Sequence, residues 1–144
     1  MTQAFEFKQS GHLNPALFDP ATRTLSTDEL TGRWVNTNRE TQGIAELMIE
    51  RDGDQFNVSG VAVGTDGPIA WPITKARALA NLEEEAGQRT MALAAIFDFG
   101  FMTAEVYLRV NKGVLVIVLF STFQDDSGRA NYVTREFFYR QDRV

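Results

Sequence analysis

The chain contains no cysteine at all and only one histidine, His12, among its 144 residues. Disulfide bonds, thiol nucleophiles and cysteine-ligated metal centres are therefore excluded, and a transition metal would lack a second imidazole ligand. The acidic turns 52–54 and 125–128 carry calcium-type ligands without the spacing of a calcium loop. No phosphate-binding glycine loop is present either. We therefore expect no metal and no cofactor.

Long apolar runs and clustered positive charge are also missing. The longest apolar runs, such as Val114–Phe120, have the length of a strand and fall far short of the ~20 residues of a membrane span. Residues 1–10 lack the basic start and apolar core of a signal peptide. The 14 Lys and Arg are scattered, and the formal net charge is −5, whereas nucleic-acid binding needs a basic patch. We expect a cytoplasmic protein that binds neither nucleic acid nor membrane.

What the chain does contain is enough apolar material for one core. Hydrophobic residues make up 44% of it, with 11 Phe, and this length is usual for a single domain. Residues 1–30 show no regular period, because Gly11, Pro15 and Pro20 interrupt them. We interpret residues 1–30 as an irregular N-terminal arm and residues 31–144 as a single barrel domain.

From Gly32 onward, apolar and polar residues alternate with the period of two that is typical of β-strands. Glycine- and asparagine-containing turns separate the alternating segments. The predicted strands are Arg33–Thr37, Ile44–Glu50, Gln55–Val63, Trp71–Leu79, Thr90–Asp98, Thr103–Val110, Val114–Phe123 and Tyr132–Arg140, with an acidic loop over 81–88. Such short connections allow only antiparallel neighbours. We predict an all-β fold, an antiparallel up-and-down β-barrel of about eight strands; a two-sheet sandwich is the alternative.

The first predicted strand opens with the sequence Leu-Thr-Gly-Arg-Trp-Val-Asn, residues 30–36. Its Gly-x-Trp resembles the opening motif of the calycins, the lipocalin and avidin type of β-barrel. The resemblance implies that Gly32 lets the strand bend and that Trp34 plugs the closed end of the barrel. It also implies a basic residue of the last strand over the indole, and Arg135 and Arg140 are the candidates for this cation–π contact. The likeness to avidins covers about residues 30–64 only.

One constellation of polar side chains lies on the predicted strand 103–110. Glu105, Tyr107 and Arg109 alternate along it and therefore share one face, opposite an aliphatic face. The favoured interpretation turns the aliphatic face inward and leaves the polar set in solvent. In the alternative, the polar set lines a cavity, with Glu105 and Tyr107 as candidate catalytic groups and Arg109 as a ligand contact.

The last predicted strand carries aromatic and charged residues on both faces, so its alternation does not identify the inner face. One candidate lining is Tyr132, Thr134, Glu136, Phe138 and Arg140; the other is Val133, Arg135, Phe137 and Tyr139. Glu136 is the third candidate for proton transfer. The further candidates for ligand contact are Tyr132, Trp71 and Phe99.

The run Val114–Phe120 is aliphatic on both faces, whereas a barrel strand exposed to water should be polar at alternate residues. A second cover is needed, either the N-terminal arm or another subunit. We slightly favour the subunit and predict a homo-oligomer.

These patterns favour one function class over two others. We expect binding of a small, largely apolar ligand in the barrel cavity. The second possibility is a cofactor-free isomerase or cyclase acting on a small organic substrate in the same cavity. The third is an oligomeric scaffold or lectin-like protein with a filled barrel.

Overall fold

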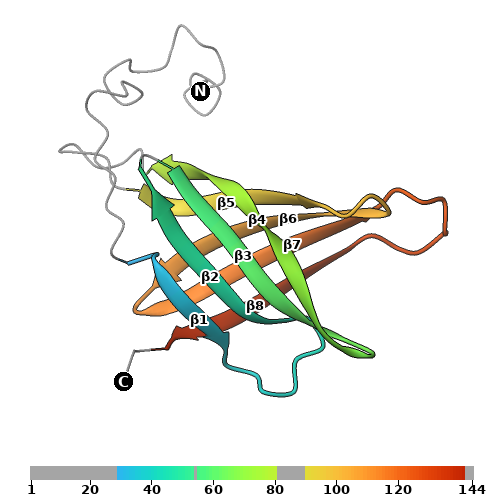
Figure 1. Ribbon diagram of the computed structural model, residues 1–144, viewed down its shortest axis with the longest axis horizontal. Helices are drawn as coiled ribbons and strands as arrows, with labels where there is room; N and C mark the ends of the chain where they lie inside the picture. Colours follow the sequence, from blue (N-terminus) through green and yellow to red (C-terminus); the bar gives the residue numbers. More distant parts are fainter. Residues whose placement is uncertain (1–28, 54, 81–89, 142–144) are drawn as a thin grey trace, which may run out of the picture.

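The computed structural model describes residues 29–53, 55–80 and 90–141. They form a closed antiparallel barrel in which eight strands pair in sequence order (Figure 1), which confirms the predicted fold class. The strands are β1 (Gly32–Asn36), β2 (Ile44–Asp52), β3 (Gln55–Gly64), β4 (Gly67–Ala80), β5 (Thr90–Asp98), β6 (Met102–Asn111), β7 (Val114–Phe123) and β8 (Tyr132–Arg140). His12 and the loop predicted over 81–88 lie outside the described residues, as does the predicted arm except for its last two positions.

Strand β4 differs most from its predicted bounds, because it begins at Gly67 and not at Trp71. It contains Pro68 and Pro72, which have no N–H to donate to a neighbouring strand. In the described part of the chain, β4 pairs with β3 from Gly67 onward but with β5 only from Arg77. The first half of β4 therefore has one free edge, where proline is tolerated.

The interior of the barrel is filled by the aliphatic face of each strand. On β6 the inward residues are Ala104, Val106 and Leu108, all fully buried, and on β7 they are Leu115, Ile117 and Leu119. Phe138 is the buried residue of β8. The inner face of β8 is thus the one that carries Glu136 and Phe138, a choice that the alternation in the sequence left open.

Trp34 closes one end of the barrel, as the calycin resemblance implied. Its side chain is 1% exposed, and its Nε1 donates a 2.9 Å hydrogen bond to the carbonyl of Leu30. The guanidinium carbon of Arg140 lies 4.8 Å from the centre of the indole. Arg135, the other candidate for this contact, instead lies 5.5 Å from the ring of Phe137. Arg140 is therefore the basic residue over the tryptophan, and Arg135 is not.

Gly32 is required here by its backbone conformation. Its φ of +131° lies in a region that L side chains rarely adopt. A β-carbon at this position would meet the side chain of Arg140 only at ordinary van der Waals distance, 3.4 Å from Nε. The glycine of the Gly-x-Trp motif therefore lets β1 bend.

A β-bulge decides where Trp71 points. Val58 of β3 pairs with Thr74 of β4, but Gly60 pairs with Trp71, so β4 has one extra residue between these pairs. Thr74 and Trp71 are consequently both turned toward the interior, whereas Ile73 between them is 73% exposed. Re-aiming a side chain in this way is a usual effect of a bulge.

The closing role of Trp34 predicts its contribution to stability. Replacing Trp34 with alanine should lower the free energy of unfolding by about 3–5 kcal/mol, because it deletes a large, fully buried aromatic side chain. Urea unfolding followed by circular dichroism measures this loss. The control is Ile73→Ala on the outer face, expected to change stability by no more than about 0.5 kcal/mol. A loss below about 1 kcal/mol for Trp34→Ala would contradict the role in closure.

Candidate functional site

A hollow of about 690 Å³ lies in the mouth of the barrel, at the end opposite Trp34. Its volume falls within the range of small-molecule sites. The walls come from the ends of β1, β7 and β8, from the loop between β1 and β2, and from β3, β4 and β6. Residues that the hollow touches include Asn36, Thr41, Gly43, Ile44, Trp71, Met102, Leu119, Ser121, Tyr132 and Glu136.

The carboxylate of Glu136 organises one wall of the hollow. Its Oε1 accepts a 3.0 Å hydrogen bond from Nδ2 of Asn36 and a 2.7 Å hydrogen bond from Oγ1 of Thr41. Asn36 also donates to the carbonyl of Ile44 and accepts from the backbone N–H of Asn38. Both donors and the oxygen of this amide side chain are therefore engaged, and the side chain holds the loop between β1 and β2 against Glu136.

Gly43 completes this wall because it leaves room for the carboxylate. Its N–H donates a 3.0 Å hydrogen bond to Oγ1 of Thr41. A β-carbon at Gly43 would stand 3.1 Å from Oε2 of Glu136, tighter than ordinary van der Waals contact. A larger residue would thus displace the carboxylate from its position in the hollow.

Ser121 adds a hydroxyl group to the wall of the hollow from β7, the strand that pairs with β8. It continues the inward-facing series of β7 beyond Leu119, and it is 1% exposed. Among the described residues, its Oγ is the one buried side-chain polar atom that makes no hydrogen bond. A buried polar atom without a partner costs free energy, and at the edge of a hollow it is positioned to bond a bound molecule.

Aromatic side chains form the apolar part of the mouth. The ring of Trp71 lies 4.9 Å from that of Phe97 and 4.9 Å from that of Phe99, measured between centroids. These rings pack together where β4 and β5 are not paired. Phe97 belongs to the buried core, and Trp71 packs against that core. The indole is therefore held in place and offers an apolar surface to a ligand.

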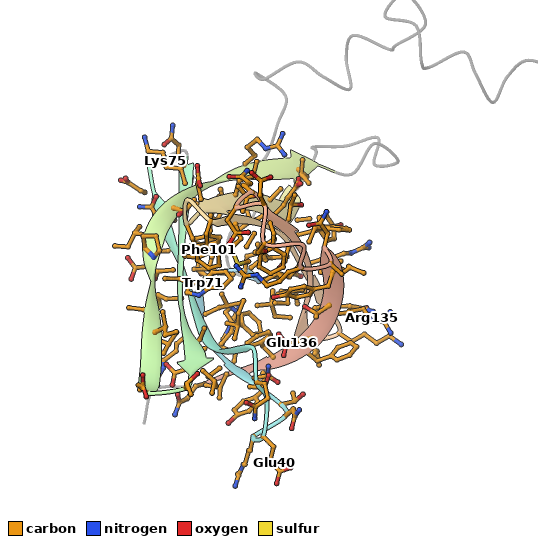
Figure 2. The ribbon with its side chains drawn as sticks, turned by 90° about the vertical axis from the view of Figure 1, so that its right-hand side faces the viewer. Glu40, Trp71, Lys75, Phe101, Arg135 and Glu136 are labelled. Carbon is orange, nitrogen blue, oxygen red and sulfur yellow. The ribbon has the colours of Figure 1, made fainter. Side chains whose placement is uncertain are left out.

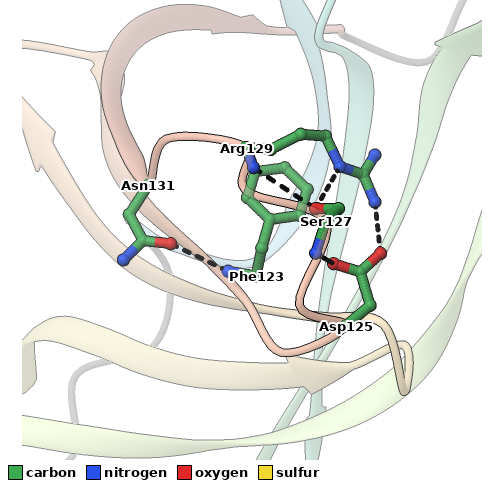
Figure 3. A network of polar contacts seen from close by, with 5 residues as sticks. All are labelled: Phe123, Asp125, Ser127, Arg129 and Asn131. Carbon is green, nitrogen blue, oxygen red and sulfur yellow. Dashed lines mark hydrogen bonds and ion pairs between the residues drawn. The ribbon is translucent and has the colours of Figure 1, made fainter.

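A network of polar contacts holds the loop between β7 and β8 beside Phe123 (Figure 3), whose ring centre lies 6.2 Å from that of Tyr132, a lining residue of the hollow. The guanidinium carbon of Arg129 lies 4.3 Å from the ring centre of Phe123 and 5.4 Å from that of Phe101. Nη2 of Arg129 contacts Oδ2 of Asp125 at 2.5 Å. Hydrogen bonds from Ser127 and from Arg129 hold the pKa of Asp125 below its usual value. This network gives the aromatic rim a defined shape.

The polar set predicted on β6 does not take part in the hollow. Glu105 and Arg109 are exposed, and Tyr107 is half-buried, all three on the outer face. The aliphatic face of β6 points inward instead, which is the favoured one of the two interpretations. These three residues therefore lie outside the interior in which the alternative interpretation placed them, because residues on the outer face of a strand cannot line the interior of the same barrel.

Several of the other predicted residues do meet in the mouth. Glu136, Tyr132 and Trp71 all line the hollow, and Figure 2 shows Trp71 and Glu136 inside the ring of strands. The ring of Phe99 packs against that of Trp71, and Phe99 is not among the residues that line the hollow.

Three residues of the site were not expected from the sequence, namely Asn36, Thr41 and Ser121. Asn36 stands two positions after Trp34 and shares its face, and Ser121 stands two positions after Leu119. The period-two alternation that predicts the inward positions of Trp34 and Leu119 therefore also predicts that Asn36 and Ser121 point inward. Thr41 lies in a loop and has no such signal.

Compared with protein-family models, with curated proteins and with solved structures, the chain shows no match. Within the described ranges, no three His, Cys, Asp or Glu side chains come together as ligands for a metal ion. The same residues include no helix long and apolar enough to cross a membrane.

The unpartnered hydroxyl of Ser121 yields a prediction about stability. Replacing Ser121 with alanine should leave the free energy of unfolding unchanged or raise it by about 1 kcal/mol, because the variant no longer buries an unbonded polar atom. Chemical denaturation of the ligand-free protein measures the change. The matched control is Thr122→Ala, exposed on the next position of β7. A clear loss of stability for Ser121→Ala would show that the hydroxyl has a partner within the fold.

Proposed function

We propose that the protein binds a small, largely apolar molecule in the mouth of its barrel. The observation that carries this proposal is the buried, unpartnered Oγ of Ser121 in the wall of a 690 Å³ hollow. Ligand sites combine apolar walls with a few well-placed polar groups. Trp71, Met102 and Leu119 supply the apolar walls here, and Glu136 with Ser121 supplies the polar groups.

The two other function classes receive less support. A scaffold with a filled barrel does not agree with the hollow of about 690 Å³, which is lined in part by core residues such as Ile44 and Leu119. For an isomerase or cyclase, Glu136 would now be the acid–base candidate, because Glu105 and Tyr107 face outward. A carboxylate held by Asn36 and Thr41 suits ligand anchoring directly, so binding is the more economical proposal.

A calycin-like relationship is part of the same proposal. Three observations support it beyond the sequence motif: the eight strands close in sequence order, Gly32 adopts a positive φ, and Arg140 covers the indole of Trp34. Calycin-type barrels of this size have room for one small ligand.

The proposed binding can be tested with a simple neutral probe. Phenylpropanol combines an apolar body with one hydroxyl, and we expect saturable binding to the wild-type protein in isothermal titration calorimetry. Replacing Ser121 with leucine should weaken this binding by about tenfold or more, because the larger side chain fills the hollow. The control Thr122→Leu alters the outer face of β7 and should leave the affinity unchanged. Equal weakening by both variants, or none by either, would contradict binding in the mouth.

We further propose that the outer face of β7 and β8 is buried between copies of this chain. Val116 and Val118 point outward on β7, and Phe120, Val133 and Phe137 beside them are all more than 40% exposed. Contiguous apolar surface of this kind is typical of interaction sites. Two residues of opposite charge belong to this face: Arg135 pairs with Val118 inside the patch, and Glu105 of β6 pairs with Phe120. A two-fold axis would bring such charges together across the interface, so a second copy is a suitable partner.

Analytical ultracentrifugation tests the assembly. The wild-type protein should sediment as a homo-oligomer at micromolar concentration, and replacing Val116 and Val118 with lysine should give a folded monomer, because charge is depleted at interface centres. Replacing Leu115 and Ile117 with lysine should instead unfold the protein, since both are fully buried. A monomeric wild type would contradict this part of the proposal.

A further inference from the structure

The charged groups around the hollow are mostly acidic. Glu40 and Glu136 line it, and Arg135 is the one cationic residue among its described lining residues. The guanidinium of Arg135 lies over Phe137 on the outside of the barrel, and Figure 2 shows it directed away from the ring of strands that encloses Glu136. A ligand in the mouth therefore meets negative charge without a neighbouring cation.

Glu136 keeps one carboxylate oxygen available to such a ligand. Both of its hydrogen bonds, from Asn36 and Thr41, go to Oε1, and Oε2 accepts none from the described part of the chain. The ion pairs in that part join Arg33 to Glu46 and Arg129 to Asp125, and neither involves Glu136. Because a half-buried carboxylate is strongly stabilised by a positively charged donor, the group best suited to Oε2 is a cation.

The rest of the hollow suits the body of an amine. The face of Trp71 is an attractive surface for a cation or for apolar atoms. Glu136 pairs with Ile117, and Ser121 lies four residues further along β7. This spacing separates the two polar groups by roughly 13 Å along the strand, with Leu119 of the same inward series between them. The hollow can thus hold an elongated molecule with a polar group at each end.

We infer that the hollow selects a small apolar molecule bearing an ammonium group. The ammonium donates to Oε2 of Glu136, its apolar body lies between Trp71 and Leu119, and the hydroxyl of Ser121 bonds a polar group at the far end. An ammonium has three donors and no acceptor, which matches a carboxylate that already accepts two hydrogen bonds. A carboxylate-bearing ligand would meet like charge. This inference rests on the proposed function and adds the chemical class of the ligand.

A series of probes with one apolar body and different head groups tests the selection. Phenylpropylamine, phenylpropanol and phenylpropanoate are titrated into the wild-type protein at neutral pH and low salt in a calorimeter. We expect the amine to bind about tenfold more tightly than the alcohol, because hydrogen bonds to charged groups are the stronger ones. The carboxylate should bind most weakly. Added salt should reduce the advantage of the amine more than the affinity of the alcohol.

Two variants assign the effect to the correct carboxylate. Glu136→Gln keeps the size and one acceptor oxygen but removes the charge, and it should bring the affinity for the amine down to that for the alcohol. Glu50→Gln, at an exposed position of β2 that does not line the hollow, is the matched control and should keep the preference for the amine. The ranking of the three probes in the wild type remains decisive even if Glu136→Gln is unstable.

The outcomes separate this inference from the proposed function. If the alcohol binds as tightly as the amine, or if Glu136→Gln keeps the full preference for the amine, the ammonium selection by Glu136 is wrong although the mouth still binds ligands. If none of the three probes binds at millimolar concentration, both the selection and the proposed function are contradicted.

Discussion

Closure of the barrel depends on the packing of Trp34 at the seam between β1 and β8. β1 is the shortest strand, and three residue pairs, from Trp34 with Arg140 to Asn36 with Phe138, join it to β8. At this seam the buried indole and the guanidinium that covers it hold the two strands together. At the other strand pairs a longer ladder of backbone hydrogen bonds does so. An open eight-stranded sheet would expose two edges. The remaining strand pairs therefore rely on this contact for a closed fold.

The same strand also sets the boundary between the filled and the hollow half of the barrel. Trp34 and Asn36 are two residues apart and both point inward, the first into the apolar core and the second into the polar mouth. Polar groups in a low-dielectric interior need partners, and Asn36 and Thr41 both donate to Oε1 of Glu136. The hydroxyl of Ser121 has no partner among the described residues. The mouth thus combines a structural network around Glu136 with two groups available for binding, Oε2 of Glu136 and Oγ of Ser121.

Strand alternation was a good guide to the fold and a weaker guide to the site. The Gly-x-Trp motif led directly to Gly32, Trp34 and the basic residue above the indole. Alternation alone did not identify the inner face of β8, because aromatic and charged residues occur on both of its faces. It also could not place Trp71, since the bulge in β4 shifts that side chain to the opposite face from the one a regular strand would give it.

The sequence by itself determined the number of strands, their order and the closed end, because period-two patterns, turn residues and a short glycine–tryptophan motif act locally on the backbone. The tertiary structure alone decided which carboxylate faces the interior. Glu105 and Glu136 stand in similar alternating strands, yet Glu105 lies outside and Glu136 inside. Which face of a strand turns inward depends on the apolar area that the strand and its neighbours bury together. This buried area is a property of the whole barrel, so the sequence of one strand does not determine it.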